Sequence, residues 1–555
     1  MTDVRRALLW GVFSVSLVML WDGWNKHNGQ PSMFSPATAV TAAASAPGSS
    51  VPAPVALGAA AAAGTVPGTA AAAAPASELV QVSTDTLTLR FDTLGATLVH
   101  AELLKHHESA DAKHPIVLLD RSASRVYLAQ TGLIPAQPGT ELPTHQTPMT
   151  VSPGERTLAA GQDELKIRFE SAEVGGAKLV KTFTLRRGQY LIGVEQEVVN
   201  TGAAPLKAQA YLQLVRDGNP LPDASSFYST FTGPAIYTEA GKFQKEEFKA
   251  IEKRSAGAKP DHETTADNGW AAMVQHYFAT AWLLPEKATR EFFTRKVDTN
   301  LYSVGMIVPL EEIAPGASRK LSSQLFVGPQ EEKRLEAMAP GLELVKDYGF
   351  VTILAKPMFW TLDKLHSFIG NWGWSIIALV VLLKIAFYWL NANAYKSMAK
   401  MKAVGPKVQE MRERLKDDPQ KMQQEMMRIY REEKVNPLGG CLPIFVQMPF
   451  FIALYWVLLS SVEMRGAPWL GWITDLSAKD PFFILPLLMT ATSLLQVWLN
   501  PTPPDPMQAK MMWIMPLAFS VMFFFFPAGL VLYWFVNNLL SIAQQWMINR
   551  QLGVA

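Results

Sequence analysis

The chain has 555 residues, 49% of them hydrophobic, and a formal net charge of +2 at pH 7. Its single cysteine, Cys441, excludes any intramolecular disulfide as a stabilising cross-link. The averages blend a polar first half with a very apolar second half, so the two halves predict different classes of structure.

The N-terminus predicts a membrane anchor. The short apolar stretch Ala7–Trp21 suits either the core of a signal peptide or a retained anchor. No small-residue cleavage site follows it closely, and Trp21 and Trp24 are typical of a membrane interface. We therefore expect an anchor at 1–24 with its N-terminus in the cytoplasm. Residues 25–76 are dominated by Ala, Pro, Gly and Ser, and this composition predicts a flexible linker.

Residues 77–335 predict a large domain of antiparallel β-strands arranged as a sandwich. Short segments alternate apolar and polar residues and are separated by Gly, Pro, Asn and Asp. About 250 residues are enough for a domain with its own core. The expected strands are 86–91, 164–169, 178–185, 190–199, 207–215, 276–284 and 319–327.

The remainder predicts a polytopic α-helical membrane protein. Residues 336–371 connect the two halves, and apolar residues at helical spacing from Phe359 to Ile369 predict an amphipathic helix at the membrane surface. Long apolar runs then follow within 372–555. With the anchor they make six expected spans, the later five being about 374–394, 441–461, 481–499, 511–526 and 530–548.

The loops between these runs set the expected orientation. Residues 391–440 contain 11 Lys and Arg, whereas 462–480 contain only Arg465 and Lys479. The positive-inside rule therefore puts the first loop in the cytoplasm. Six spans then leave both termini in the cytoplasm, and the β domain lies outside it.

The cytoplasmic segment 395–436 predicts a helical hairpin. Methionine, valine and leucine form one apolar stripe from Met398 to Leu415 and a second from Met422 to Ile429, and Asp417-Asp418-Pro419 breaks the chain between them. The opposite faces are basic and could contact RNA, lipid phosphate or an acidic partner, or could simply be solvated. The basic residues of this partner surface are Lys407, Arg412, Arg414, Arg428 and Arg431.

Lys384 is the only ionisable side chain in any of the apolar segments. It lies ten residues after Trp374, about 15 Å into a hydrocarbon core of about 30 Å. A charge at that depth costs about 3 kcal/mol and usually faces a bundle interior or a wet cavity. Lys384 therefore either extends its stem toward the cytoplasmic headgroups or lines a positively charged cavity within the membrane.

The sequence contains no signature of an enzyme. It has no HExxH, no paired aspartates within the spans and no phosphate-binding loop ending in Lys-Ser or Lys-Thr. The histidines of the β domain, such as His100 and His276, lack the spacing of metal ligands. We expect no catalytic residue, cofactor or metal. A multi-pass transporter using Lys384 is the alternative, although no carboxylate in a span could complete a proton relay.

Several motifs in one order resemble the YidC family of membrane-protein insertases, relatives of the mitochondrial Oxa and chloroplast Alb proteins. The resemblance covers about 348–548. It is carried by Gly370-Asn-Trp-Gly373, Met398-Ala-Lys-Met-Lys402, Pro406-Lys407, Met411-Arg-Glu-Arg-Leu415, Asn436-Pro-Leu-Gly-Gly-Cys441, Gln447-Met-Pro449, Asp505-Pro-Met-Gln508 and Gly529-Leu-Val-Leu-Tyr533.

The resemblance implies a Gram-negative inner-membrane insertase with a periplasmic β domain and a five-helix core at 372–555. That core would hold a hydrophilic groove open to the cytoplasm and to lipid. Its clients would be nascent membrane proteins. It would act alone or with the Sec translocon, and the hairpin could meet the ribosome or the signal-recognition-particle pathway.

The resemblance also implies site residues. Lys384 occupies the position of a groove arginine, and Trp389 stands where relatives often have proline, so we expect no kink at the end of this span. The chain ends five residues after Arg550, without the basic tail of some relatives. The polar groove candidates, which could instead join helices, are Gln447, Gln496, Asn537 and Asn538. The candidate client contacts, which could instead face lipid, are Phe450, Phe451, Phe523, Phe524 and Tyr533.

Overall fold

The computed structural model of the chain describes residues 77–108, 113–136, 140–221, 230–255, 258–285, 287–415, 418–433, 442–500 and 506–551. The expected anchor at 1–24 and the expected linker at 25–76 lie outside these residues, as does Cys441.

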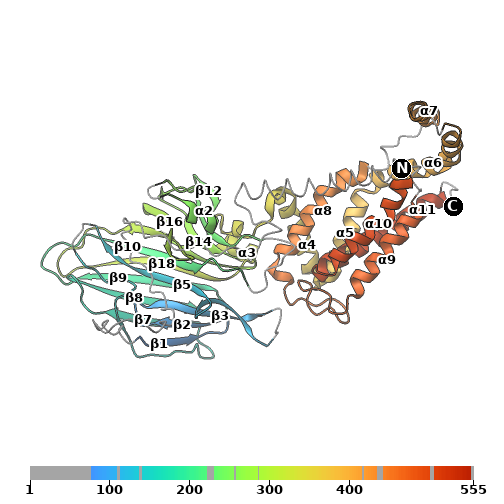
Figure 1. Cartoon of the computed structure of the whole chain (residues 1–555). Helices are drawn as coiled ribbons and strands as arrows, with labels where there is room; N and C mark the ends of the chain where they lie inside the picture. Colours follow the sequence, from blue (N-terminus) through green and yellow to red (C-terminus); the bar gives the residue numbers. More distant parts are fainter. Residues whose placement is uncertain are drawn as a thin grey trace, which may run out of the picture.

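Strands make up the N-terminal part of the described chain (Figure 1). In chain order they are β1 (Leu79–Ser83), β2 (Leu87–Asp92), β3 (Thr97–His107), β4 (Pro115–Arg121), β5 (Val126–Pro135), β6 (Met149–Val151), β7 (Glu164–Ser171), β8 (Ala177–Arg186), β9 (Leu191–Asn200), β10 (Ala208–Asp217), β11 (Gly233–Thr238), β12 (Lys242–Lys245), β13 (Thr265–Ala266), β14 (Trp270–Val274), β15 (Phe278–Leu283), β16 (Arg290–Asp298), β17 (Leu301–Pro309) and β18 (Ser318–Pro329).

These strands form two nine-stranded antiparallel sheets that pack face to face. One sheet has the order β1-β2-β3-β4-β5-β10-β17-β16-β13, and the other has the order β12-β11-β14-β15-β18-β9-β8-β7-β6. Side chains along a strand point alternately to its two faces, and this explains the packing. In β9 every second side chain from Ile192 to Asn200 is buried between the sheets. The predicted sandwich is confirmed, and the seven expected strands fall on β2, β7, β8, β9, β10, β15 and β18.

Helices make up most of the rest of the described chain. They are α2 (Phe248–Lys253), which lies among the strands, α3 (Glu332–Met338), α4 (Thr352–Ile369), α5 (Trp372–Ala386), α6 (Tyr388–Arg414), α7 (Pro419–Glu432), α8 (Leu442–Ser460), α9 (Ile484–Leu499), α10 (Pro506–Phe523) and α11 (Ala528–Gln551), with short 3-10 turns at Leu342–Val345, Gly349–Val351 and Val462–Met464.

Helices α4, α5, α8, α9, α10 and α11 pack beside one another in a bundle that adjoins the β domain (Figure 1). Their shared core contains Leu362, Ile376, Leu454 and Leu532, all buried. The pair α6 and α7 projects beyond this bundle, and its own apolar core joins Val408 to the stripe of the second helix.

The expectation of an unkinked second span is wrong. The helix breaks at Phe387, whose φ of −95° and ψ of 11° are not helical, and α5 and the start of α6 meet at a bend of 65°. Proline is not the cause. The ring of Phe387 packs edge-on against Phe450 of α8, with centroids 5.1 Å apart, and the chain then turns so that Asn391 also reaches α8.

Within the described residues, no individual helix has both the length and the apolar character needed to cross a membrane. By length and composition, the bent pair of α5 with Tyr388–Ser397 meets that requirement. Shorter apolar stretches of 10–17 residues are Val446–Ser460, Ile484–Leu499 and Ala509–Phe523.

Polar contacts attach the β domain to the end of α8. Lys346, whose side chain is fully buried, places Nζ 3.0 Å from both carboxylate oxygens of Glu463, just after α8. His276, in the turn between β14 and β15, hydrogen bonds through Nε2 to the carbonyl of Leu459 at 2.9 Å. Arg465 donates to the carbonyl of His107 at 3.1 Å. The two regions therefore meet through specific contacts.

Candidate functional site

Lys384 lies near the end of α5, and its ammonium group reaches α11. Its Nζ donates a hydrogen bond to Ser541 Oγ at 2.7 Å. Ser541 Oγ in turn donates to the carbonyl of Asn537 at 2.7 Å, and the hydroxyl of Tyr395 on α6 also hydrogen bonds to Ser541. No charged partner acts on Lys384 in the part of the chain that the structure describes. A neutral hydroxyl is therefore the partner of this cation.

A small cavity of about 30 Å³ lies beside Lys384. This volume admits water but no polypeptide segment. Three helices and the break at Phe387 surround it, and the wall mixes apolar, amide and ammonium groups. The lining residues are Val380, Leu383, Lys384, Phe387, Gln447, Phe450, Tyr533 and Asn537. The structure thus brings Lys384 together with two of the four polar candidates and two of the five aromatic ones.

Gln447 connects this cavity to α6. It lies on α8, and its Nε2 donates to Asn391 Oδ1 at 2.8 Å. Asn391 is 5% exposed, and its Nδ2 is buried without a hydrogen-bond partner. The amide pair therefore joins α6 to α8 directly beside the cavity.

The other two polar candidates lie elsewhere. Asn538 faces α9 rather than α5, and its Nδ2 donates to Ser493 Oγ at 2.8 Å. Gln496 lies on α9, outside the cavity wall. Adjacent residues on a helix point about 100° apart, so Asn537 and Asn538 reach different neighbours. The hydrogen bond of Asn538 fits the interpretation in which such groups join helices.

The remaining aromatic candidates pack among other rings. Phe451 contacts Tyr533 and Trp534, with centroids 5.5 and 4.1 Å away. Phe523 is 2% exposed and packs against Trp534. Phe524 packs against Phe483, with centroids 5.5 Å apart. Only Phe450 and Tyr533 of this set reach the cavity wall.

The basic face of α6 and α7 is partly neutralised by neighbouring carboxylates. Lys407 pairs with Glu433 at 2.5 Å, and Arg428 pairs with Glu425 at 2.6 Å. Arg414 lies 3.9 Å from Glu425. Within the described part of the hairpin, Arg412 and Arg431 have no ion pair, and Arg431 is exposed.

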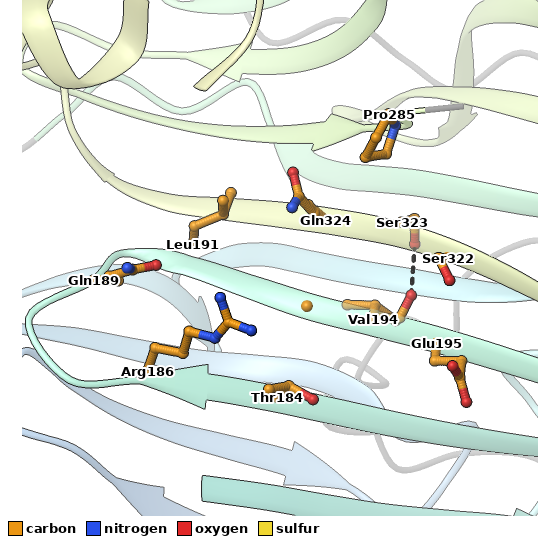
Figure 2. Close-up of a pocket in the computed structure, with 11 residues that line it drawn as sticks. Thr184, Arg186, Gln189, Leu191, Val194, Glu195, Pro285, Ser322, Ser323 and Gln324 are labelled. Carbon is orange, nitrogen blue, oxygen red and sulfur yellow. Dashed lines mark hydrogen bonds between the residues drawn. The ribbon is translucent and has the colours of Figure 1, made fainter. Parts of the chain in front are cut away.

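A larger cavity, of about 260 Å³, lies on the outer face of the second sheet, and Figure 2 shows its side chains along β8, β9 and β18. Its two charged lining residues already have partners. Arg186 lies 3.4 Å from Glu164, and Glu195 lies 2.9 Å from Lys320. Ser323 donates to the carbonyl of Val194 at 3.2 Å. This groove has the character of a solvated polar surface.

The described residues contain no group of three or more His, Cys, Asp and Glu side chains that could hold a metal ion. The site described above offers an ammonium, amides, hydroxyls and aromatic rings, and these groups can bind and orient a polar chain.

Sequence reasoning missed Ser541, Asn391 and Tyr395. Ser541 has a signal in the sequence, because it follows Asn537 by four residues on the same helix face. Asn391 and Tyr395 are also four residues apart, but Asn391 falls at the end of the expected straight span and Tyr395 at the start of the expected hairpin. The bend at Phe387 is what turns Asn391 toward α8.

Two family models together match nearly the whole described chain. Residues 79–361 match the YidC periplasmic domain, and residues 364–554 match the 60Kd inner membrane protein.

Full-length relatives agree with these matches. The chain is 56% identical over 558 residues to the membrane protein insertase YidC of Cupriavidus metallidurans, covering 99% of this chain and 98% of that protein. It is 51% identical over 562 residues to the protein of the same name from Burkholderia multivorans, covering 99% of each. A solved structure described as an active YidC insertase with its first transmembrane domain resolved is 18% identical, with a TM-score of 0.38, and the match covers 84% of this chain and 91% of that one.

Proposed function

The chain belongs to the YidC family of membrane protein insertases, and on that premise we propose that it inserts its clients through a hydrophilic groove beside Lys384. It is an inner-membrane protein with a periplasmic domain, and its clients are nascent membrane proteins. Its relatives are named as insertases rather than as enzymes, and those names give no support to a transporter.

The proposed topology has six spans, with the anchor at 1–24 and five spans in the core at 372–555. The hairpin at 395–436 lies in the cytoplasm, and the β domain at 77–335 lies in the periplasm. The excess of 11 basic residues in 391–440 over two in 462–480 supports this orientation. Both termini are then cytoplasmic, and α4 within 336–371 lies along the membrane surface.

The observation that carries the proposed mechanism is the cavity beside Lys384. Lys384, Gln447 and Asn537 come from three different helices, and Phe450 and Tyr533 line the same space. A charged residue in a client tail faces a barrier of about 3 kcal/mol in hydrocarbon. A wet cavity that contains a cation lowers that barrier for an acidic tail, because the tail exchanges water for polar groups and an opposite charge.

The membrane potential then completes the transfer. Onward movement of one negative charge to a positive exterior is favoured by about 2.3 kcal/mol per 100 mV. The apolar segment of the client leaves sideways into lipid, where Phe450 and Tyr533 are its proposed contacts.

The proposed partners follow from the exposed surfaces. The exposed guanidinium of Arg431, together with Arg412, suits phosphate or carboxylate groups. We assign this surface to the ribosome or the signal-recognition-particle pathway, and larger clients to joint action with the Sec translocon.

The test is insertion of clients with acidic or neutral tails into vesicles that contain the purified protein. Lys384→Arg keeps the cation and should retain insertion of both clients. Lys384→Glu reverses the charge and should slow the acidic-tailed client at least tenfold while slowing the neutral-tailed one less. Equal rates for the wild-type protein and Lys384→Glu with the acidic client would contradict electrostatic attraction. Photocrosslinking to a client from positions 384 and 447 tests the location of the groove independently.

A further inference from the structure

Asn391 and Gln447 form an amide pair joined by one hydrogen bond, and each residue keeps one further amide atom without a partner in the described part of the chain. Gln447 Nε2 donates to Asn391 Oδ1 at 2.8 Å. The second amide group of Asn391, Nδ2, is buried and has no partner. Gln447 Oε1 has no recorded hydrogen bond within the described chain, and Gln447 lines the cavity beside Lys384. One donor and one acceptor are therefore available side by side.

An amide donor without a hydrogen-bond partner is energetically unfavourable at the buried position of Asn391. A buried N–H without a partner destabilises a protein, and structures seldom retain one without a reason. Asn391 is 5% exposed and lies in the bent helix pair that has the length and apolar character of a span. Lipid offers no hydrogen bond in compensation.

The donor and acceptor match one particular ligand group. A peptide unit carries one C=O and one N–H, and a chain that leaves water for the membrane must find partners for both. The C=O of such a unit can accept from Asn391 Nδ2, and its N–H can donate to Gln447 Oε1. Amide groups that pair in this way recognise backbone and ignore the identity of the side chains.

We propose that Asn391 and Gln447 are a docking subsite for the polypeptide backbone of a client entering the groove. In the empty protein the two amides bind each other, and a client peptide group replaces that hydrogen bond. The cavity of about 30 Å³ has no room for a chain, so loading separates α6 from α8 at this pair. The break at Phe387 lets α6 move without disturbing α5. This subsite rests on the proposed groove but not on the charge of Lys384.

The structure supplies a matched control pair. Gln545 on α11 donates to Asn500 Oδ1, which follows α9, at 3.1 Å, and this amide pair also joins two helices. Gln545 is 3% exposed and also has an unpartnered amide atom, Oε1. It does not line the cavity. Like Asn391, Gln545 is buried and keeps one amide atom without a partner, but that atom is an acceptor rather than a donor and lies away from the cavity.

The experiment uses full-length protein in vesicles, with Cys441→Ser as the background. Cysteines at 391 and 447, or at 500 and 545, are joined by a short bifunctional thiol reagent. Because cysteine replaces both amides, the unjoined 391–447 protein should already insert a neutral-tailed client about tenfold more slowly than the parent, and joining should slow it at least tenfold further. The 500–545 protein should stay within twofold of the parent whether joined or not. Normal insertion through the joined 391–447 protein would overturn the proposal, and so would an equal loss from both joined pairs.

Point variants separate this subsite from the charge of the groove. Asn391→Leu should slow acidic-tailed and neutral-tailed clients by the same factor, about tenfold, because both carry the same backbone. Asn391→Gln should restore most of the rate, and Gln545→Leu should match the parent. Lys384→Glu should act mainly on the acidic client. If Asn391→Leu slowed only acidic clients, or left both at the parent rate, the backbone subsite would be wrong while the proposed groove could stand.

Discussion

The β domain and the helical bundle place their large apolar side chains in opposite ways. In the described part of the β domain, Leu79 is the one large apolar residue that is exposed, at 51%. The bundle exposes many such residues, including Trp498 at 69%, Ile385 at 66% and Val521 at 63%. A surface facing water hides such groups, whereas a surface facing lipid gains nothing from hiding them.

The two regions also treat a buried lysine differently. Lys181 of β8 is fully buried, and its Nζ donates to the carbonyls of Gly95 and Thr131, both at 2.7 Å. These acceptors belong to the backbone and cannot leave. Lys384 is only half buried and pairs with the hydroxyl of Ser541 beside a cavity. Lys181 therefore joins fixed segments of the backbone, whereas the hydroxyl partner of Lys384 can be replaced by a ligand.

The largest expected effect comes from placing a charge on the exposed apolar surface of the bundle, which faces lipid in the proposed topology. Val521→Asp on α10 should destabilise the membrane-integrated protein by about 3 to 4 kcal/mol, because an aspartate inside a span is strongly unfavourable. Leu79→Asp in β1, where the side chain meets water, should change stability by less than about 0.5 kcal/mol. Resistance to alkaline extraction from membranes and melting in detergent measure the difference. Similar losses in both variants would remove the contrast between the two surfaces.

The second prediction concerns the ion pair that joins the two regions. Glu463→Gln leaves the Lys346 ammonium buried without a counter-charge and should cost about 3 kcal/mol. The double variant Lys346→Met with Glu463→Leu should recover most of that loss, because no buried charge is left. Chemical unfolding of the parent, the single variants Lys346→Met and Glu463→Leu, and the double variant gives the coupling energy. A double variant as unstable as the sum of the two single variants would show that the residues act independently.

The third prediction concerns the dependence of β-domain stability on pH, which is the smallest of the three effects when measured over a single pH unit. Burial lowers the pKa of Lys181 from 10.5 to about 7. Between these two values the unfolded chain binds more protons than the folded one, so the free energy of unfolding rises with pH, by up to about 1.4 kcal/mol per pH unit. Below about pH 7 both states are protonated and this contribution is constant. Thermal melting from pH 7 to pH 9.5 should show the rise, and Lys181→Met should reduce its slope. An unchanged slope would contradict the assignment to Lys181.

The strand and helix pattern could be predicted because it depends on local periodicity. Segments such as 164–169 and 178–185 alternate strictly and became β7 and β8. The run 530–548 became most of α11. The depth of Lys384 in the membrane stays a prediction, since it comes from counting residues along an expected straight span.

The partners of Lys384 depend on how separate helices pack, and no local pattern gives that information. Ser541 lies 157 residues away in the chain, yet its hydroxyl is the group that Lys384 reaches. Of the adjacent pair Asn537 and Asn538, only the first lines the cavity, because the rotation of α11 about its axis decides which one faces α5.

The sequence by itself determined a β domain followed by a bundle of apolar helices, and a single lysine within an apolar run, because each of these follows from the order of polar and apolar residues. Only the tertiary structure decided that the second helix bends at Phe387 without a proline and that Asn391 meets Gln447. Both depend on contacts between α6 and α8, which lie far apart in the chain until the bundle packs.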